Sequence, residues 1–134
     1  MKNIDYSKLS EITVRTQAEL DLIPLDFKGR IYVECGRRDW LQIRHNYYFP
    51  VMVKGNSSVV ANESSCVEAY ENSTVVANEN STVWAYENST VVANENSFVK
   101  AYGNSSVIAN GNVLVVDSLQ GAKIRISGNA RIVF

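Results

Sequence analysis

The sequence is poor in the residues from which metal sites, disulfide frameworks and flexible linkers are built. It has two cysteines, two prolines, seven glycines and one histidine in 134 residues. Collagen-like and proline-rich classes are excluded, and the single His45 cannot form a multi-histidine metal site. No segment approaches the roughly 18 apolar residues of a membrane helix, and residues 1–10 lack the apolar core of a signal peptide. We expect a cytoplasmic protein that needs no cofactor and contacts no membrane.

Cys35 and Cys66 are a single pair without a metal-binding or redox motif around them. A reducing cytoplasm keeps such residues as thiols, which pack like small apolar side chains. We expect no disulfide.

Charge is nearly balanced, with 13 basic and 14 acidic residues, so the chain is not a globally basic nucleic-acid binder. The distribution is uneven, however. Residues 55–110 hold six acidic residues and one basic residue, Lys100. Nine basic and seven acidic residues precede this segment, and three basic and one acidic follow it, a net charge of +2 on each side. An acidic belt therefore separates two mildly basic ends, and direct nucleic-acid binding is not expected.

An eight-residue repeat fills the middle of the chain. From Gly55 eight octads follow without a gap: GNSSVVAN, ESSCVEAY, ENSTVVAN, ENSTVWAY, ENSTVVAN, ENSFVKAY, GNSSVIAN and GNVLVVDS. Position five is valine in all eight, position seven is alanine in seven, and position three is serine in seven, whereas positions four and six vary. Side chains alternate across a strand, so the constant positions share one face, which we expect to point inward.

The eighth position alternates between two residue types. It is asparagine in four octads and tyrosine in three: Asn62, Asn78, Asn94, Asn110, Tyr70, Tyr86 and Tyr102. A coil of sixteen residues stacks like on like at the roughly 4.8 Å spacing of neighbouring strands, and stacked asparagine amides can then hydrogen-bond between coils. A coil of three octads would stack tyrosine on asparagine. We predict sixteen residues per coil, with turns at the Tyr-Glu-Asn and Asn-Glu-Asn steps in which Asn and Gly take left-handed backbone conformations.

The predicted fold is all-β: a parallel β-solenoid with two octads, sixteen residues, per coil and a small N-terminal α/β cap. Residues 1–46 are the expected N-terminal capping segment, and residues 47–134 are the expected solenoid, with five to six coils in all. In the cap, Thr16 precedes a short helix that Pro24 limits, and residues 30–34 are predicted to be a strand.

The repeat can be followed less clearly to both sides of the octads. Upstream, Val51 and Val53 fit inward positions, and Leu41, Ile43 and His45 fit the inward positions of one strand earlier.

Downstream, one extra residue near Leu119 shifts the frame. Four apolar residues then take the inward positions: Ile124, Ile126, Ile132 and Phe134. Nothing after this apolar strand is expected to cover it, and an open solenoid end offers unpaired strand edges to another chain. We predict a homodimer that pairs through these four residues.

Five glutamates occupy the first octad position, in the turns: Glu63, Glu71, Glu79, Glu87 and Glu95. Stacking by sixteen residues gives two acidic columns on opposite edges. They either attract a basic partner surface or imitate a nucleic-acid backbone, or they are solvated turn charge that keeps the sheets soluble. A glycoside hydrolase needs two carboxylates in unlike environments at one pocket, which identical columns do not supply, so no catalytic residue is expected.

An aromatic ladder is predicted on one sheet, with Trp84 on the same face between Tyr70, Tyr86 and Tyr102. It is either a binding platform, because aromatic anchors dominate interface hot spots, or a stack that stabilises only its own coils.

The opposite sheet exposes a flat column of β-branched residues: Val60, Val76, Val92 and Ile108. Such a column suits a lateral protein interface. A regular Thr/Val lattice can also order water as in ice-binding solenoids, although only two of the four flanking hydroxyl positions are threonine.

The tandem units ENSTVVAN and ENSTVWAY resemble the Asn-Ser-Thr-Val-x-Ala-Tyr repeats of parallel β-helix proteins from bacteriophages and gut bacteria. The resemblance covers residues 55–118 and is specific for fold rather than for function. It implies a non-enzymatic accessory factor. Small phage proteins of this size are often inhibitors of host defence, which would place the protein in the host cytoplasm.

The expected function is a non-enzymatic module that presents a rigid surface to a protein partner. That surface is either the acidic edge with the aromatic ladder, namely the five turn glutamates, the three ladder tyrosines and Trp84, or the flat column of β-branched residues on the opposite sheet. The first alternative is a phage-encoded, anti-CRISPR-like inhibitor of a nucleic-acid-handling defence enzyme, in which the glutamate columns mimic nucleic acid. The second alternative is an ice-binding protein.

Overall fold

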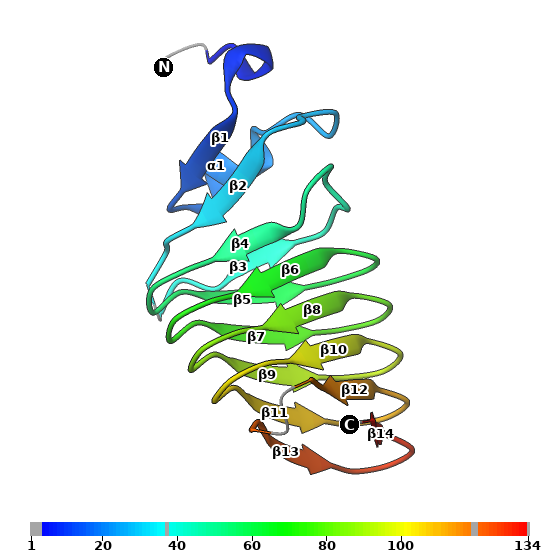
Figure 1. The fold of residues 1–134 in the computed structure, drawn as a ribbon. Coiled ribbons are helices and arrows are strands. Elements are labelled where there is room, and N and C mark those ends of the chain that lie inside the picture. Colours follow the sequence, from blue (N-terminus) through cyan, green and yellow to red (C-terminus); the bar gives the residue numbers. More distant parts are fainter. Residues whose placement is uncertain (1–3, 37, 119–120, 134) are drawn as a thin grey trace.

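The chain winds into a parallel β-solenoid whose two sheets form the two sides of a flattened spiral (Figure 1). The structure is a computed structural model, and it describes residues 4–36, 38–118 and 121–133. Eight strands form one sheet, here sheet A, and six form the other, sheet B. From β2 onward the strands alternate between the two sheets along the chain, whereas β1 and β2 follow one another within sheet A, and all pairs are parallel. The predicted fold class is confirmed.

The elements are short and regular. Sheet A contains β1 (Glu11–Val14), β2 (Arg30–Val33), β4 (Val51–Val53), β6 (Cys66–Ala69), β8 (Thr82–Ala85), β10 (Phe98–Ala101), β12 (Leu114–Asp117) and β14 (Arg131–Val133). Sheet B contains β3 (Leu41–Ile43), β5 (Ser58–Ala61), β7 (Thr74–Ala77), β9 (Thr90–Ala93), β11 (Ser106–Ala109) and β13 (Lys123–Ile126). The 3-10 helix η1 (Tyr6–Lys8) and the α-helix α1 (Gln17–Asp21) complete the described chain.

Strands of one sheet pair at intervals of sixteen residues throughout the repeat. Val67 pairs with Val83 in sheet A, and Val75 pairs with Val91 in sheet B, as the sixteen-residue coil requires. After β12 the interval is seventeen, because Val107 pairs with Ile124. This change confirms the predicted frame shift; Leu119 itself lies outside the described residues.

The core is thin and is built from the constant octad positions. In the repeat strands burial alternates residue by residue, and the valines of position five and the alanines of position seven are almost fully buried. Serines of position three are buried as well. One coil of such small side chains buries little apolar area, so a coil is stable only when neighbouring coils stack on it.

The solenoid has about eight turns, more than the five to six predicted. The difference arises because β1, β2 and β3 already belong to the two sheets. Their pairing intervals do not follow the octads: Glu11 pairs with Arg30, and Tyr32 with Met52, nineteen and twenty residues apart. Irregular turns between these strands hide the coil period from a search for octads.

The helix α1 covers one edge of sheet B. Thr16 Oγ1 accepts a hydrogen bond from the Glu19 amide while the Glu19 carboxylate accepts one from the Thr16 amide, which confirms the predicted helix start. The Gln17 side-chain amide then faces β3. The Gln42 N–H donates to Gln17 Oε1 at 2.7 Å, and Gln17 Nε2 donates to the Gln42 carbonyl at 3.1 Å. This amide replaces the peptide group of a neighbouring strand and protects the edge.

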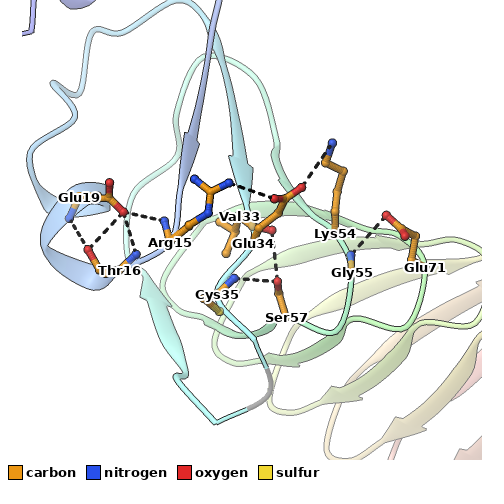
Figure 2. A network of polar contacts seen from close by, with 10 residues as sticks. All are labelled: Arg15, Thr16, Glu19, Val33, Glu34, Cys35, Lys54, Gly55, Ser57 and Glu71. Carbon is orange, nitrogen blue, oxygen red and sulfur yellow. Dashed lines mark hydrogen bonds and ion pairs between the residues drawn. The ribbon is translucent and has the colours of Figure 1, made fainter.

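Figure 2 shows how the N-terminal strands join the first repeat coils. Glu34, which follows β2, lies 3.6 Å from Arg15 and 3.9 Å from Lys54. Ser57 Oγ accepts a hydrogen bond from the Cys35 amide at 2.9 Å and donates to the last carbonyl of β2 at 3.4 Å. Exposed ion pairs contribute about 1 kcal/mol at most, so the continuous sheet and the buried Ser57 contribute most to this junction.

Two predictions for single residues have different outcomes. Leu41 and Ile43 are buried as expected, but β3 ends at Ile43, and His45 is exposed with its ring edge-on to Tyr47 at 6.0 Å. The third inward position predicted for His45 was therefore wrong, because the strand is too short to contain it. The two cysteines are free thiols, as predicted.

The turns occur at the predicted steps, but the left-handed residue is not asparagine. All five turn glutamates have φ between 59° and 61°, and Gly55, Gly103 and Gly111 occupy equivalent positions with φ of 68°, 61° and 78°. No asparagine among the described residues has a positive φ. A side chain in this conformation costs roughly 1–2 kcal/mol relative to the right-handed one, which makes glutamate an unfavourable choice for the backbone.

Deletion of residues 71–86 removes one whole coil and recreates the Tyr-Glu step by joining Tyr70 to Glu87. We call the strand that one coil contributes to a sheet a rung. We expect this variant to keep β-sheet circular dichroism and a cooperative urea transition, because every remaining rung keeps its register. Deletion of residues 71–78 exchanges the sheets of all later strands, and we expect it to lose several kcal/mol of unfolding free energy. Equal stability of the two variants would show that sixteen residues are not the structural unit.

Candidate functional site

The outer faces of the two sheets differ in how much their side chains vary. In sheet B, octad positions four and six are nearly uniform: Ser58, Thr74, Thr90 and Ser106 at position four, and Val60, Val76, Val92 and Ile108 at position six. In sheet A, no two rungs agree: Cys66, Thr82, Phe98 and Leu114 at position four, and Glu68, Trp84, Lys100 and Val116 at position six. All the strong variation in the repeat therefore lies on one face.

The coil geometry does not require this variety. Both sheets have four-residue repeat strands with the same alternation of burial. Sheet B shows that serine or threonine with valine or isoleucine is sufficient for the outer side of such a rung. The side chains of sheet A are therefore not explained by packing within the solenoid. We define the outer side chains of β6, β8, β10 and β12 as the variable face.

Position six of the variable face forms one column along the solenoid. The strand register places Glu68 beside Trp84, Trp84 beside Lys100 and Lys100 beside Val116. All four side chains are half-buried. An anion, an aromatic ring, a cation and an aliphatic side chain thus succeed one another at intervals of one coil.

The predicted tyrosine ladder flanks this column. The ring centroids of Tyr70 and Tyr86 are 4.9 Å apart with an interplanar angle of 7°, and those of Tyr86 and Tyr102 are 4.8 Å apart at 4°. The stacking predicted from the sixteen-residue period is confirmed. Because the ring faces cover one another, a partner would meet the ring edges and hydroxyl groups of the inner tyrosine.

The ladder also positions the two charges of the column. The Tyr70 hydroxyl donates a hydrogen bond to the Glu68 carboxylate, and Lys100 Nζ lies 5.6 Å from the centroid of the Tyr102 ring. Burial and then the bond to Glu68 raise the pKa of Tyr70 above its usual value. The hydroxyl therefore stays protonated to a higher pH than an exposed tyrosine and can donate to the carboxylate over that whole range.

The turn glutamates lie in two columns, as predicted, but the columns are not equivalent. On the edge that follows the tyrosines, the Gly55 amide donates to Glu71 Oε1 and the Glu71 amide donates to Glu87 Oε1, both at 3.3 Å. On the asparagine edge, three exposed glutamates make no side-chain hydrogen bond or ion pair with any described residue: Glu63, Glu79 and Glu95. Attraction of a basic partner and mimicry of nucleic acid stay predictions.

The asparagines of position eight form a continuous amide ladder beside sheet B. Asn78, Asn94 and Asn110 each donate to the previous asparagine at 3.0–3.2 Å. Asn62 donates to Gln42 Oε1 at 2.9 Å, and Ser127 Oγ donates to Asn110 Oδ1 at 2.7 Å. The predicted hydrogen bonding between coils is confirmed. The valine column of sheet B is half-buried except for Ile108, and its use as an interface or an ice-binding lattice stays a prediction.

Beyond Ser57, the buried serines of position three divide into two groups according to whether asparagine or tyrosine precedes their turn. After asparagine, the hydroxyl groups of Ser65, Ser81 and Ser97 donate to the preceding asparagine carbonyls at 2.8–2.9 Å. After tyrosine, three buried hydroxyl groups have no partner among the described residues: those of Ser73, Ser89 and Ser105. The turn backbone is alike in both groups, because the Ser81 and Ser89 amides both bond to the first turn carbonyl at 3.2 Å. The two groups therefore differ in the hydrogen bonding of the serine hydroxyl, not in that of the serine amide.

Substitution of Ser81 and Ser89 by alanine provides a matched comparison of these two groups. We expect Ser81→Ala to lower the free energy of unfolding by about 1 kcal/mol, because a buried hydrogen bond is lost. We expect Ser89→Ala to leave it unchanged or slightly raised, because an unpaired buried hydroxyl is removed. Urea unfolding measures both. Equal destabilisation would mean that the Ser89 hydroxyl is bonded in solution.

The two sheets end on β13 and β14 in the described chain. The register places Ile124, Ile126 and Ile132 opposite inward residues of the preceding rungs, as predicted. Ile126 is nevertheless 49% exposed, because no described strand lies beyond it, and Val133, which pairs with the outer residue Val116, is 48% exposed on the outer side of the last strand of sheet A. Phe134 lies outside the described residues. Pairing of two chains through this end stays a prediction.

Exposed apolar side chains also occur in the N-terminal segment, which the search for repeats missed. Leu22 and Leu25 border a hollow with Arg44 and Tyr47, and Trp40 borders a second hollow near Arg15. These residues follow no period, so pattern analysis of the sequence has no signal for them. The variable face does have a signal in the sequence. Alternate octads, which belong to the same sheet, differ at positions four and six in sheet A and are nearly uniform there in sheet B.

In the described part of the chain, no cluster of three histidine, cysteine or acidic side chains is arranged to hold a metal ion. No helix in those residues is long and apolar enough to cross a membrane. No family model, curated protein or solved structure matches the chain. Function has to be inferred from the surface of the solenoid itself.

Proposed function

We propose that the protein is a non-enzymatic binding module that presents the variable face of sheet A to a protein partner. One observation carries this proposal: side chains depart from the repeat on sheet A only, although both sheets meet the same packing requirement. A surface whose chemistry is not needed for folding is available for recognition.

The composition of the variable face supports a protein partner. It brings together Trp84, Phe98 and Leu114 with the charged residues Glu68 and Lys100, and aromatic anchors surrounded by polar groups are typical of binding hot spots. The stacked strands hold these side chains on a rigid support, so little conformational entropy is lost on binding. Catalytic groups usually converge in a concavity, whereas these side chains project from one side of a sheet.

Affinity capture from the native host, with three baits, tests the proposal. Trp84→Ser changes position six of the variable face, and Val92→Ser makes the matched change on sheet B. We expect the native protein and Val92→Ser to retain the same partner, and Trp84→Ser to lose it. With the purified partner, the dissociation constant should rise by about 30-fold or more for Trp84→Ser, as for a hot-spot residue. Retention by Trp84→Ser with loss by Val92→Ser would overturn the proposal.

We propose further that two copies pair through the exposed edge formed by β13 and β14. In the described chain the opposite edge of sheet B is covered by Gln17, whereas Ile126 and Val133 are nearly half exposed. Unpaired strand edges beside apolar side chains favour association with another strand.

Sedimentation at tens of micromolar protein tests this pairing. We expect a dimer for the native chain and for Val76→Lys, and a monomer for Ile126→Lys, which places a charge at the edge. A native chain that sediments as a monomer would contradict the proposal. Loss of the dimer in Val76→Lys alone would place the contact on sheet B instead.

A further inference from the structure

We infer that the variable face accepts an amphipathic α-helix of the partner, which lies along the solenoid axis and crosses the rungs of sheet A. The helix would place a cation against Glu68, an apolar side chain against Trp84 and an anion against Lys100. This inference rests on the proposed function and adds the kind of partner segment and its charge order.

Charge complementarity carries the first step. Glu68 and Lys100 are the only charged residues on the outer positions of β6, β8, β10 and β12, and neither forms an ion pair with a described residue. Both are oriented by the tyrosine ladder, through the Tyr70 hydroxyl and the Tyr102 ring. Two oriented, half-buried charges of opposite sign favour a partner with the opposite order of charges.

The apolar residues define a stripe between and beyond these charges. Trp84 lies on the rung between Glu68 and Lys100, while Phe98 and Leu114 are neighbours at position four. A partner that satisfies both charges therefore also covers Trp84, and its apolar contacts continue toward β12. An apolar stripe bordered by charges is the pattern of one face of an amphipathic helix.

The rung spacing selects a helix over other backbone forms. Successive rungs are 4.8–4.9 Å apart at the tyrosine ladder. Helix residues three and four apart rise by about 4.5 and 6 Å, so alternate steps of three and four supply one side chain per rung. Same-face residues of an extended strand are about 6.6–6.8 Å apart, so their side chains no longer match the rung spacing after one rung. A polyproline II segment repeats every ~9.3 Å and would miss Trp84.

Three synthetic helical peptides with one common apolar stripe test the inference. They carry Lys and Glu, Lys and Lys, or Glu and Glu seven residues apart, since seven helical residues span about 10.5 Å, close to two rungs. The chain has two tryptophans, so Trp40→Phe leaves Trp84 as the only tryptophan, and its fluorescence reports binding at the variable face. We expect the Lys/Glu peptide to bind about tenfold more tightly than either like-charged peptide.

Charge substitutions on the protein should change this preference in a defined way. Glu68→Lys should prefer the Glu/Glu peptide, and Lys100→Glu should prefer the Lys/Lys peptide. Each substitution introduces a residue that position six already accepts on another rung, so the fold should persist. Val76→Lys on sheet B is the matched control and should leave the preference unchanged. A central proline in the Lys/Glu peptide should abolish binding, because it prevents the helix.

The outcomes separate this inference from the proposed function. If the three peptides bind alike or not at all, or if the preference does not follow the charge substitutions, the helical partner is wrong. The proposed function still stands in that case when Trp84→Ser loses the native partner. If Trp84→Ser keeps that partner, the variable face is not the binding surface and both proposals fail.

Discussion

The structure depends on one constraint: each rung must lie in register on the rung before it. Parallel strands of sixteen-residue coils make this possible, since every backbone group of a rung finds its partner one coil away. In-register stacking then places identical side chains in contact. Tyr86 stacks between two tyrosines, and Asn78 and Asn94 are joined through their amides. These ladders are consequences of the register, and they also oppose any slip, because a shift by one octad would place tyrosine against asparagine.

The fold of the repeat could be predicted from the sequence because the octad pattern determines the register of the strands. Valine at the fifth position of every octad and the alternation of asparagine with tyrosine at the eighth leave one arrangement that stacks like on like. β1 and β2 were not predicted to belong to the solenoid, because Glu11 pairs with Arg30 and Tyr32 with Met52 at intervals of nineteen and twenty residues that do not follow the octads. The left-handed turn residue was assigned to asparagine and glycine on intrinsic preference; the glycines at the first octad position do adopt it, but at the other turns it falls on Glu79 and its equivalents rather than on asparagine.

The candidate site was predictable only in part. The tyrosine ladder and Trp84 follow directly from the octads, but Phe98, Lys100 and Leu114 look like random variation until the octads are separated by sheet. That separation requires the coil length first. The roles of Tyr70 and Tyr102 in orienting Glu68 and Lys100 depend on rotamers, which no sequence pattern contains. The variable face is therefore visible in the sequence only after the coil length is known and the octads of the two sheets are compared separately.

The turn glutamates have a consequence for how the stability of the protein is distributed. Glycine fits the same backbone conformation at Gly55 and Gly103 without strain, yet five successive turns carry a carboxylate there. At roughly 1–2 kcal/mol each, the five together oppose folding by an amount comparable with the whole net stability of an ordinary domain. Hydrogen bonds from the turn amides to Glu71 and Glu87 offset part of this conformational cost, but only on the edge that follows the tyrosines. Burial of the valine and alanine side chains must therefore stabilise the solenoid by more than this backbone cost, and the turn glutamates keep a conformation that their backbone disfavours.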